Sequence, residues 1–436
     1  MNEIMKPSIL PGFMELTPDN QILFNKIKDT IRKNYEKFGF LPIDTPVIEK
    51  SEVLLAKGGG ETEKQIYKVV KGKADMSMRF DLTVPLARYV AQHYSDLSFP
   101  FKRYHIGKVY RGERNQRGRF REFYQADIDI VGNDSLDIIN DAEIPSVIYS
   151  TFKDLGFDSF TIKINNRKIL NGFFSSLGIE DSTFILRTVD KLEKIGLDKV
   201  KEELLEQSLL EENIESILEF IGIKGSNDEI IAELKKLNVK DEHFIQGLEE
   251  IEDTVKYIRL FQVPEENFQL DLTIARGLDY YTGTVYETFL DHYPQIGSVC
   301  SGGRYDDLAN YYTKQKLPGV GISIGLTRLF YQLTEANIIE ADGNSLVDIM
   351  IIPMEGYEDN GIEIASKLRD EGINTQIFFE KSKMGKKFNY ADKLNIPYVI
   401  VIGEDEVNSK EYSLRNMKSG DQEKISIGEI IKRLKG

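Results

Sequence analysis

The segment from Pro100 to Val131 constrains the fold most, because it predicts two strands joined by a tight loop. Polar and apolar residues alternate through 126–131, as they do in a strand with one buried face. Gly112, Asn115 and Gly118 are typical of a loop between antiparallel strands. We therefore expect an antiparallel sheet in this part of the chain.

Helices are expected around these strands and in one long insertion. Apolar residues recur with helical spacing over 20–39, and the pattern of 135–155 is also helical. From 168 to 262 the pattern is helical and acidic, with nineteen Asp and Glu against ten Lys and Arg between Thr188 and Gln262. We interpret 168–262 as a helical insertion in a larger domain that spans 1–335.

The pattern changes after a polar connector at 336–346. Strands and helices then alternate with short connections, which favours an α/β domain with a mainly parallel sheet over 347–436. The predicted strands are 347–353, 374–379 and 398–402, and the predicted helices are 357–371 and 384–394. A chain of 436 residues also exceeds the size at which a single core stops growing, so two or three domains are expected.

The composition excludes several classes of protein. A net charge of −15 argues against a surface coated in positive potential. No apolar run reaches about 18 residues, so we expect no membrane span, and residues 1–7 lack the pattern of a signal peptide. Cys300 is the single cysteine, which rules out an internal disulfide and fits a reducing cytoplasm.

The four histidines show no metal-ligand spacing, so no protein-bound metal is expected. The phosphate-binding pattern G-x-x-x-x-G-K-[ST] is also missing from the sequence. Any phosphate site must therefore be built in another way.

One short segment carries the opposite charge from the whole chain. Between Phe101 and Gln125 eight Lys and Arg side chains face only Glu113 and Glu122, and six of the eight are arginine. The planar guanidinium fork suits phosphate better than an ammonium does. We interpret the segment as a local anion site, although a solvated basic hairpin remains an alternative.

Residues two apart on a strand share a face, which groups the polar side chains of this hairpin. Arg111 lies with Glu113, and Arg119 lies with Arg121 and Phe123. An arginine fork, a carboxylate and an aromatic ring can hold a triphosphate, an adenine amine and an adenine ring respectively. The alternative is a cross-strand ladder of ion pairs beside a core phenylalanine.

A second polar group lies at 276–287, where an arginine, an aspartate and two tyrosines occupy the six positions 276–281, with Gly277 and Gly283 as hinge points. Such a set suits a ligand with a planar or charged end. Asp81, Gln125 and Asp129 add acceptors near strand ends, where an ammonium or an imidazole can be bound. Singly, each of these three is more often a surface or capping residue.

These segments resemble the histidyl-tRNA synthetase family of class II aminoacyl-tRNA synthetases over essentially the whole chain. The class-wide motifs are matched by Pro46, by Arg111–Phe123 and by Gly325–Arg328. The blocks specific to the histidine family are matched by Arg276–Tyr281 and Ser301–Asp306. Residues 386–404 resemble the family's anticodon-binding domain.

The resemblance implies an α/β protein with an α+β catalytic domain, an antiparallel sheet flanked by helices. It implies a ligase that activates L-histidine with ATP, releases pyrophosphate, and transfers histidine from the adenylate to the 3′ end of tRNA(His). ATP is then a substrate, Mg²⁺ is expected with it, and the protein is expected to be a homodimer without a membrane partner. Residues 347–436 become an anticodon-binding domain.

The resemblance also implies roles for individual residues. Arg276 and Arg111 are the expected catalytic cations. The expected histidine-binding residues are Asp81, Leu82, Thr83, Arg111, Gln125, Asp129, Arg276, Tyr280 and Tyr281. The expected ATP-binding residues are Arg111, Glu113, Arg119, Arg121, Phe123 and Arg328.

Two other interpretations stay open. One is the synthetase-like regulatory subunit of the first enzyme of histidine biosynthesis, against which 347–436 and the arginines at 111, 276 and 328 argue. The other is an inactive paralogue that only binds RNA or a partner protein. The segment 6–16 departs from the family's usual opening run, so part of the site floor is expected to differ.

Overall fold

The computed structural model describes residues 5–56, 60–113, 118–179, 181–189, 192–206, 209–274, 281–341, 343 and 345–435. Its internal contacts divide the chain into two compact units. The first holds 1–15 and 24–339, and the second holds 16–23 and 340–436. Each unit has its own sheet and its own core, and the two are described separately below.

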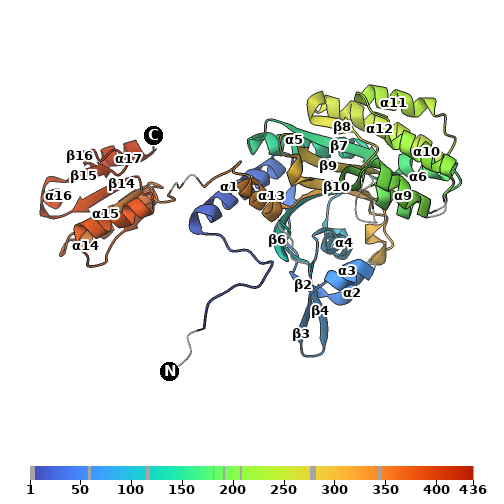
Figure 1. Ribbon diagram of the computed structural model, residues 1–436. Coiled ribbons are helices and arrows are strands. Elements are labelled where there is room, and N and C mark those ends of the chain that lie inside the picture. The colour runs from blue at the N-terminus through green and yellow to red at the C-terminus, as the bar shows by residue number, and fades with distance from the viewer. Residues whose placement is uncertain are drawn as a thin grey trace. The chain divides into compact units, whose positions relative to one another are not determined.

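The first unit is built on an eight-stranded sheet (Figure 1). Its five inner pairings are antiparallel, while β1 and β8 join the two edges in parallel. In spatial order the strands are β1 (Leu41–Pro42), β5 (Phe101–Tyr110), β6 (Glu122–Val131), β11 (Gly319–Ile324), β10 (Cys300–Tyr305), β9 (Thr284–Leu290), β7 (Phe160–Asn166) and β8 (Phe268–Leu270). The predicted antiparallel sheet is thus confirmed, and the proline-containing β1 lies at an edge, as proline requires.

Helices cover one face of this sheet, chiefly α1 (Pro18–Lys37), α5 (Ile139–Asp154), α12 (Glu242–Leu260) and α13 (Leu326–Glu335) (Figure 1). Even-numbered residues of β6 point to that face, where the Phe24 ring packs against Tyr124 and Phe330. The Tyr35 hydroxyl of α1 donates to the carbonyl of Ala126 at 3.0 Å. Odd-numbered residues of β6 therefore point to the opposite face.

A small three-stranded sheet and three helices precede β5. The strands are β2 (Ile48–Lys50), β4 (Ala74–Met78) and β3 (Lys68–Lys71), in that spatial order, and the helices are α2 (Ser51–Leu55), α3 (Gly60–Gln65) and α4 (Thr83–Gln92). Short 3₁₀ turns occur at η1 (Tyr94–Asp96), η2 (Glu265–Asn267), η3 (Pro294–Ile296) and η4 (Leu308–Tyr311).

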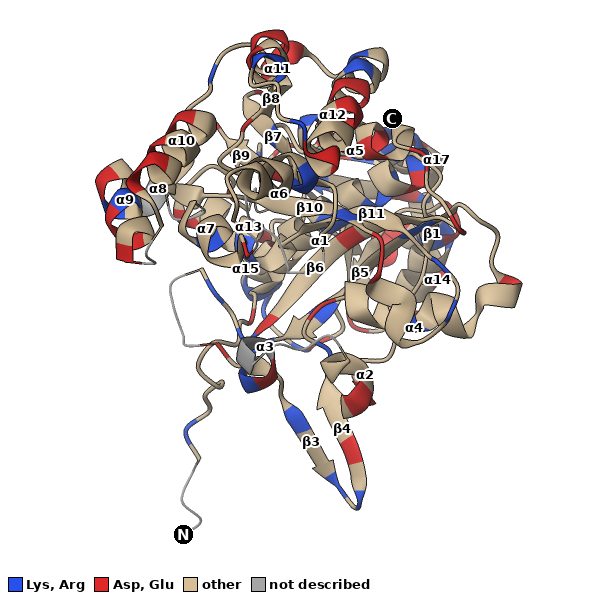
Figure 2. Cartoon of the chain, turned by 90° about the vertical axis from the view of Figure 1, so that its right-hand side faces the viewer, with Lys and Arg blue, Asp and Glu red and all other residues tan. Residues whose placement is uncertain are grey.

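The segment between β7 and β8 is helical, as its sequence predicts. Before α12 it contains α6 (Arg167–Ser176), α7 (Thr183–Val189), α8 (Leu192–Ile195), α9 (Leu197–Glu206), α10 (Glu211–Ile221) and α11 (Asn227–Lys236). Ser226 and Glu229 form a capping box that starts α11, and Asp241 caps α12. Acidic side chains recur along α9 to α12, as Figure 2 shows.

The second unit has a five-stranded sheet with the spatial order β13 (Thr375–Ile377), β12 (Ile349–Pro353), β14 (Tyr398–Ile402), β15 (Glu411–Asn416) and β16 (Gln422–Ser426). Its helices are α14 (Glu358–Asp370), α15 (Met384–Lys393), α16 (Glu404–Ser409) and α17 (Ile427–Lys435). The first three strands are parallel, as predicted, whereas β15 and β16 join antiparallel. The central strand β12 is buried on both faces, which explains its unbroken apolar sequence.

The β5–β6 strands end at the pair Tyr110 and Glu122, although the Arg111 amide still donates to the carbonyl of Arg121 at 2.9 Å. The expected grouping holds in part. Arg111 and Glu113 line one cavity together with Arg119 and Phe123, whereas Arg121 is not in that lining. Among the described residues, no helix is both long enough and apolar enough to cross a membrane.

Candidate active site

A cavity of about 480 Å³ lies against the sheet of the first unit. Its floor includes Gln125, Asp127 and Asp129, which are successive odd-numbered residues of β6. These three side chains therefore project from the face opposite the covering helices. The neighbouring strands β10 and β11 contribute the rest of the floor, mostly small residues such as Ser301 and Ser323.

Glycines create room for these side chains. A Cβ at Gly321, the cross-strand partner of Asp129, would lie 2.4 Å from the Oδ1 atom of Asp129 and 2.3 Å from the carbonyl oxygen of Ile128. A Cβ at Gly303 would lie 2.6 Å from the carbonyl oxygen of Thr284. Real Cβ atoms do not approach so closely, so glycine at 321 and 303 is what keeps this part of the sheet hollow.

The floor carries three buried carboxyl groups, each 2–3% exposed. Burial raises the pKa of Asp81 and of Asp129 to about 6, and that of Asp127 to about 7. Nearby Arg103 opposes the shift in all three. The buried carboxyl groups of the floor therefore favour the binding of a cationic or hydrogen-donating ligand.

Three acceptors on the floor have no partner within the described part of the chain. They are the Oδ2 atom of Asp81, the Oε1 atom of Gln125 and the Oδ1 atom of Asp127. Asp81 and Gln125 are otherwise fixed, because Asp81 Oδ1 accepts the Val84 amide at 3.1 Å and Gln125 Nε2 donates to Ser323 Oγ at 2.7 Å. A buried acceptor without a partner is costly, so a ligand donor such as an ammonium fits here.

The Asp129 carboxylate is held from two sides. Its Oδ1 atom accepts the Tyr305 hydroxyl at 2.8 Å, and its Oδ2 atom is ion-paired with Arg103. Tyr281, one of the expected tyrosines, also lines the cavity near this point. Lone pairs that remain on Asp129 can accept from a ring N–H.

The rim of the cavity has the opposite charge from the floor. Arg111 donates from Nε to the carbonyl of Phe80 at 2.9 Å, and its guanidinium lies 5.2 Å from the centre of the Phe123 ring. Arg119 pairs with Glu113 at 3.3 Å. Arg328 sits at the start of α13, where its Nη2 atom donates to the carbonyl of Ile296 at 3.3 Å. Cations, a carboxylate and an aromatic ring together suit a nucleotide.

Most of the residues expected from the sequence meet in this cavity. The predicted residues in its lining are Asp81, Thr83, Arg111, Glu113, Arg119, Phe123, Gln125, Asp129, Tyr281 and Arg328. Leu82 is fully buried, and its carbonyl accepts from Arg103 at 3.4 Å. Arg121 turns away, donating to the carbonyls of Glu113 and Pro11 at 3.1 and 3.3 Å. Arg276 and Tyr280 lie outside the described residues.

Sequence reasoning missed several residues at the site. Asp127 and Glu287 line the cavity, Tyr305 binds Asp129, and Arg103 is ion-paired with Asp129. Asp127 was within reach, since strand alternation places it on the face of Gln125 and Asp129. The role of Arg103 depends on cross-strand pairing with Asp129, which a single sequence does not reveal.

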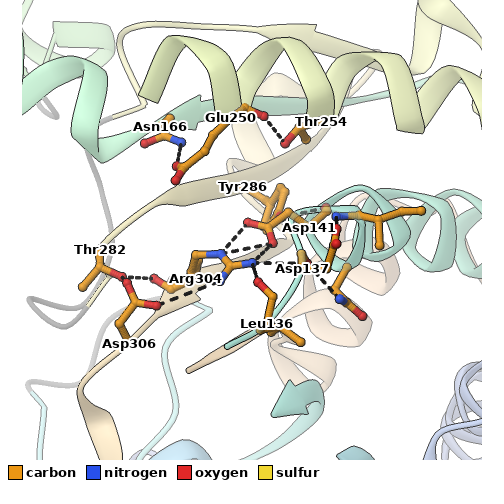
Figure 3. A network of polar contacts seen from close by, with 12 residues as sticks. Leu136, Asp137, Asp141, Asn166, Glu250, Thr254, Thr282, Tyr286, Arg304 and Asp306 are labelled. Carbon is orange, nitrogen blue, oxygen red and sulfur yellow. Dashed lines mark hydrogen bonds and ion pairs between the residues drawn. The ribbon is translucent and has the colours of Figure 1, made fainter. Parts of the chain in front are cut away.

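Strand β10 is anchored on its other face by a polar network (Figure 3). The Arg304 guanidinium forks onto the buried carboxylate of Asp141 in α5, with Nη2 at 2.6 Å from Oδ2 and Nε at 3.1 Å from Oδ1. Arg304 also donates to the carbonyl of Leu136 at 3.0 Å. At the strand's end the Thr282 hydroxyl donates to Asp306 at 2.6 Å. The segment that carries Tyr281 is thereby tied to β10.

The family model described as histidyl-tRNA synthetase matches residues 12–329, and the one described as anticodon binding domain matches 348–436. The chain belongs to the histidyl-tRNA synthetase family. One curated relative, "Histidine--tRNA ligase" of Clostridium tetani (strain Massachusetts / E88), is 64% identical over 99% of this chain and 99% of its own length.

Solved structures agree with this assignment. The crystal structure of histidyl-tRNA synthetase from Nostoc sp. PCC 7120 superposes with a TM-score of 0.89 at 39% identity, covering 99% of each chain. A Bacillus halodurans structure described as an ATP phosphoribosyltransferase regulatory subunit/histidyl-tRNA synthetase reaches a TM-score of 0.77 at 20% identity, covering 92% of this chain and 99% of its own. At that identity the likeness shows the fold alone.

Proposed function

We propose that the cavity binds histidine on its floor and ATP at its rim. As a member of its family, the chain activates L-histidine with ATP to histidyl-adenylate and pyrophosphate, and then transfers histidine to tRNA. The observation that carries the proposed location is the charge division of the cavity, with carboxylates below and arginines above. A zwitterionic amino acid and a polyphosphate need opposite surroundings, and this cavity offers both.

The floor suits histidine atom by atom. Asp81 Oδ2 and Gln125 Oε1 are placed to accept from the α-ammonium, and Asp129 to accept from a ring N–H of the imidazole. Tyr281 is the proposed neighbour of the ring, and Tyr280 is expected to assist it. A site that hydrogen-bonds a polar ring rejects apolar analogues by about 10⁴–10⁵, because its own groups would otherwise be left unpaired.

The rim suits the nucleotide. Phe123 is the proposed stacking partner of the adenine ring and Glu113 the proposed partner of its amine, while Arg111, Arg119 and Arg328 face the phosphates. Arg121 is not part of this proposal, because its guanidinium turns toward the N-terminal segment.

The first reaction step needs no covalent enzyme nucleophile. A carboxylate oxygen of histidine forms a bond to the α-phosphorus while the bond from that phosphorus to the bridging oxygen breaks, and pyrophosphate leaves. Negative charge grows on the α-phosphate oxygens, where Arg111 and Arg276 are the proposed stabilising cations. Loss of one such donor typically costs roughly 3 kcal/mol or more. Positioning supplies the rest of the acceleration.

Mg²⁺ is proposed to arrive with ATP rather than to be held by the protein alone. In the described residues no group of three or more His, Cys, Asp or Glu is suited to hold a metal ion. Mg²⁺ commonly binds through substrate phosphates with one or two carboxylates, and supplies charge neutralisation there.

Assembly and the second unit complete the proposal. We propose that 1–335 is the catalytic domain, that 347–436 reads the anticodon of tRNA(His), and that the protein is a homodimer built around Pro46 in the cytoplasm. The match of 348–436 to the anticodon-binding family supports the second point. Light scattering during size-exclusion chromatography measures the dimer, and a monomeric mass at micromolar concentration would contradict it.

An ATP–pyrophosphate exchange assay with a panel of amino acids tests the function. We expect exchange with histidine alone. The absence of exchange with any amino acid would overturn the assignment and favour a regulatory or binding role. Arg276→Ala is expected to abolish exchange while the melting temperature stays near that of the parent; exchange near the parent rate would remove Arg276 from the mechanism.

A further inference from the structure

Arg103 is a buried, charged side chain next to Asp129 of the cavity floor, on the same face of the sheet. It lies on β5 with no exposed surface and is among the largest fully buried side chains of the chain. Its cross-strand partner is Asp129. A buried arginine is costly unless its charge is compensated. The Nη2 atom of Arg103 has partners, whereas its Nε and Nη1 atoms have none among the described residues, so its ion pair carries the compensation.

The Arg103 guanidinium joins two parts of the proposed histidine site. It is ion-paired with Asp129 Oδ2, and its Nη2 atom donates to the carbonyl of Leu82 at 3.4 Å. Leu82 stands between Asp81 and Thr83, which both line the cavity. Arg103 is not among the residues described in that lining, so it acts on the ligand only through its neighbours.

Among the described residues that face Asp129, Arg103 supplies the positive charge. Asp127 lies beside it on β6 and Asp81 lies before α4, and both are acidic. Tyr305 reaches it from β10 as a neutral donor. His105 is the next inward-facing residue of β5, but burial and Arg103 lower the pKa of His105 to about 3, so its imidazole is neutral.

We propose that Arg103 is a positioning residue for histidine recognition, which keeps Asp129 ionised and joins it to the Asp81–Thr83 segment. This inference rests on the proposed function, in which Asp129 accepts from the imidazole. Arg103 thereby determines over what pH range the floor can read a neutral histidine ring, although it does not touch the ligand itself.

Removal of the Arg103 guanidinium would destabilise the ionised form of Asp129. Asp129 binds a ring N–H as a carboxylate, and burial already raises its pKa to about 6 while Arg103 lowers it. Without the guanidinium the pKa rises further. If it rose by about two units, the ionised fraction at pH 7 would fall roughly tenfold. As the pH is lowered, the variant would then lose affinity for histidine at a higher pH than the parent does.

The experiment measures the KM of histidine in ATP–pyrophosphate exchange between pH 5.5 and 9. Arg103→Met removes the charge and keeps much of the volume. We expect its histidine KM to be about tenfold higher at pH 7, to approach the parent value as pH rises toward 9, and to leave the KM of ATP within about twofold. Free histidine titrates at about pH 6.5 in the same way for both proteins, so the ratio of the variant's histidine KM to the parent's at each pH isolates the effect of Arg103.

Two further variants keep the test decisive. Arg103→Lys restores a cation without the planar fork, so the pH profile returns toward the parent while the KM stays a few-fold high. If Arg103→Met does not fold, Arg103→Met combined with Asp127→Asn removes one charge of each sign and serves in its place. A KM profile parallel to that of the parent in the folded variant would overturn the proposal.

Asp129→Asn distinguishes an error in the proposed histidine site from an error in the role of Arg103. If that substitution leaves the histidine KM unchanged, Asp129 does not read the ring and the proposed function of the floor fails. If it raises the KM while Arg103→Met keeps the parent's pH profile, the floor assignment stands and only the role of Arg103 is wrong.

Discussion

The floor and the rim of the cavity use charge in opposite ways. On the floor, Asp81, Asp127 and Asp129 are 2–3% exposed, and their main partners lie within the sheet or next to it. At the rim, the side chains of Arg119 and Glu113 are 50% and 23% exposed, and they pair with each other across 3.3 Å.

The difference shows where selectivity is built. Buried groups cannot exchange a lost partner for water, so the floor penalises a wrong ligand strongly. Exposed ion pairs are screened and contribute little, so the rim can rearrange as a nucleotide enters and pyrophosphate leaves. The same substitution type should therefore have a large effect on the floor and a small one at the rim.

Asp129→Asn is expected to show the largest effect. It leaves the buried Arg103 without its ion-pair partner, and removing one partner of a buried pair typically costs about 3–5 kcal/mol. We expect kcat/KM for histidine in the exchange assay to fall by roughly 10³-fold or more. Asp158→Asn, an exposed carboxylate change, is the matched control. A loss below tenfold would mean that the floor does not differ from the rim.

Gly321→Ala is expected to come next. The added Cβ would lie 2.4 Å from Asp129 Oδ1, and overpacking a fixed site typically costs about 1–3 kcal/mol. The histidine KM should rise roughly tenfold to a hundredfold while the ATP KM is unchanged. Gly428→Ala, where the new atom meets nothing within 4 Å, controls for the substitution. An equal rise in both KM values would show that the floor and rim are not independent.

Arg119→Ala is expected to have a smaller effect. An exposed pair is typically worth about 0.2–1 kcal/mol, so the ATP KM should rise no more than about fivefold. The effect should shrink further as salt is added. Lys153→Ala removes another exposed, paired cation and should leave the ATP KM unchanged. A salt-independent loss of a hundredfold would make Arg119 part of a rigid site after all.

Asp127→Asn is expected to change stability rather than turnover. Burial raises the pKa of Asp127 to about 7, so the folded protein binds its proton more tightly than the unfolded chain does. Stability from this group is present below about pH 4 and is lost as pH rises to about 7. The variant should therefore melt higher than the parent by a few degrees at pH 8, with less gain at pH 5. An equal shift at both values would contradict the raised pKa.

The sequence predicts the bounds of helices and strands better than it predicts which strands pair with one another. The strand 398–402 of the second unit has the predicted bounds, because apolar runs and short connections are local signals. Strands β15 and β16 turn the sheet antiparallel, which the preceding strand–helix alternation does not indicate.

At the site, the same limit applies. Motif positions such as Arg111 and Asp129 could be placed in advance, because the resemblance marks them. Arg103 could not, because its contact with Asp129 comes from a different strand. Tyr305 lies in the matched block Ser301–Asp306, but its contact with Asp129 is likewise visible only in the fold. Arg121 is not in the described cavity lining and donates to the carbonyls of Glu113 and Pro11, beyond the end of the regular strand pairing at Tyr110.

Two consecutive residues of strand β10 bind carboxylates on opposite faces of the sheet. Arg304 binds Asp141 of α5 on one face, and Tyr305 binds Asp129 on the other. Because side chains alternate, a slip of this strand by one residue would exchange the two. It would carry a guanidinium into the cavity and press a phenol against the buried carboxylate of Asp141. The two contacts thus disfavour any shifted pairing of β10. The correct register of this one strand therefore maintains the distribution of charge on the cavity floor.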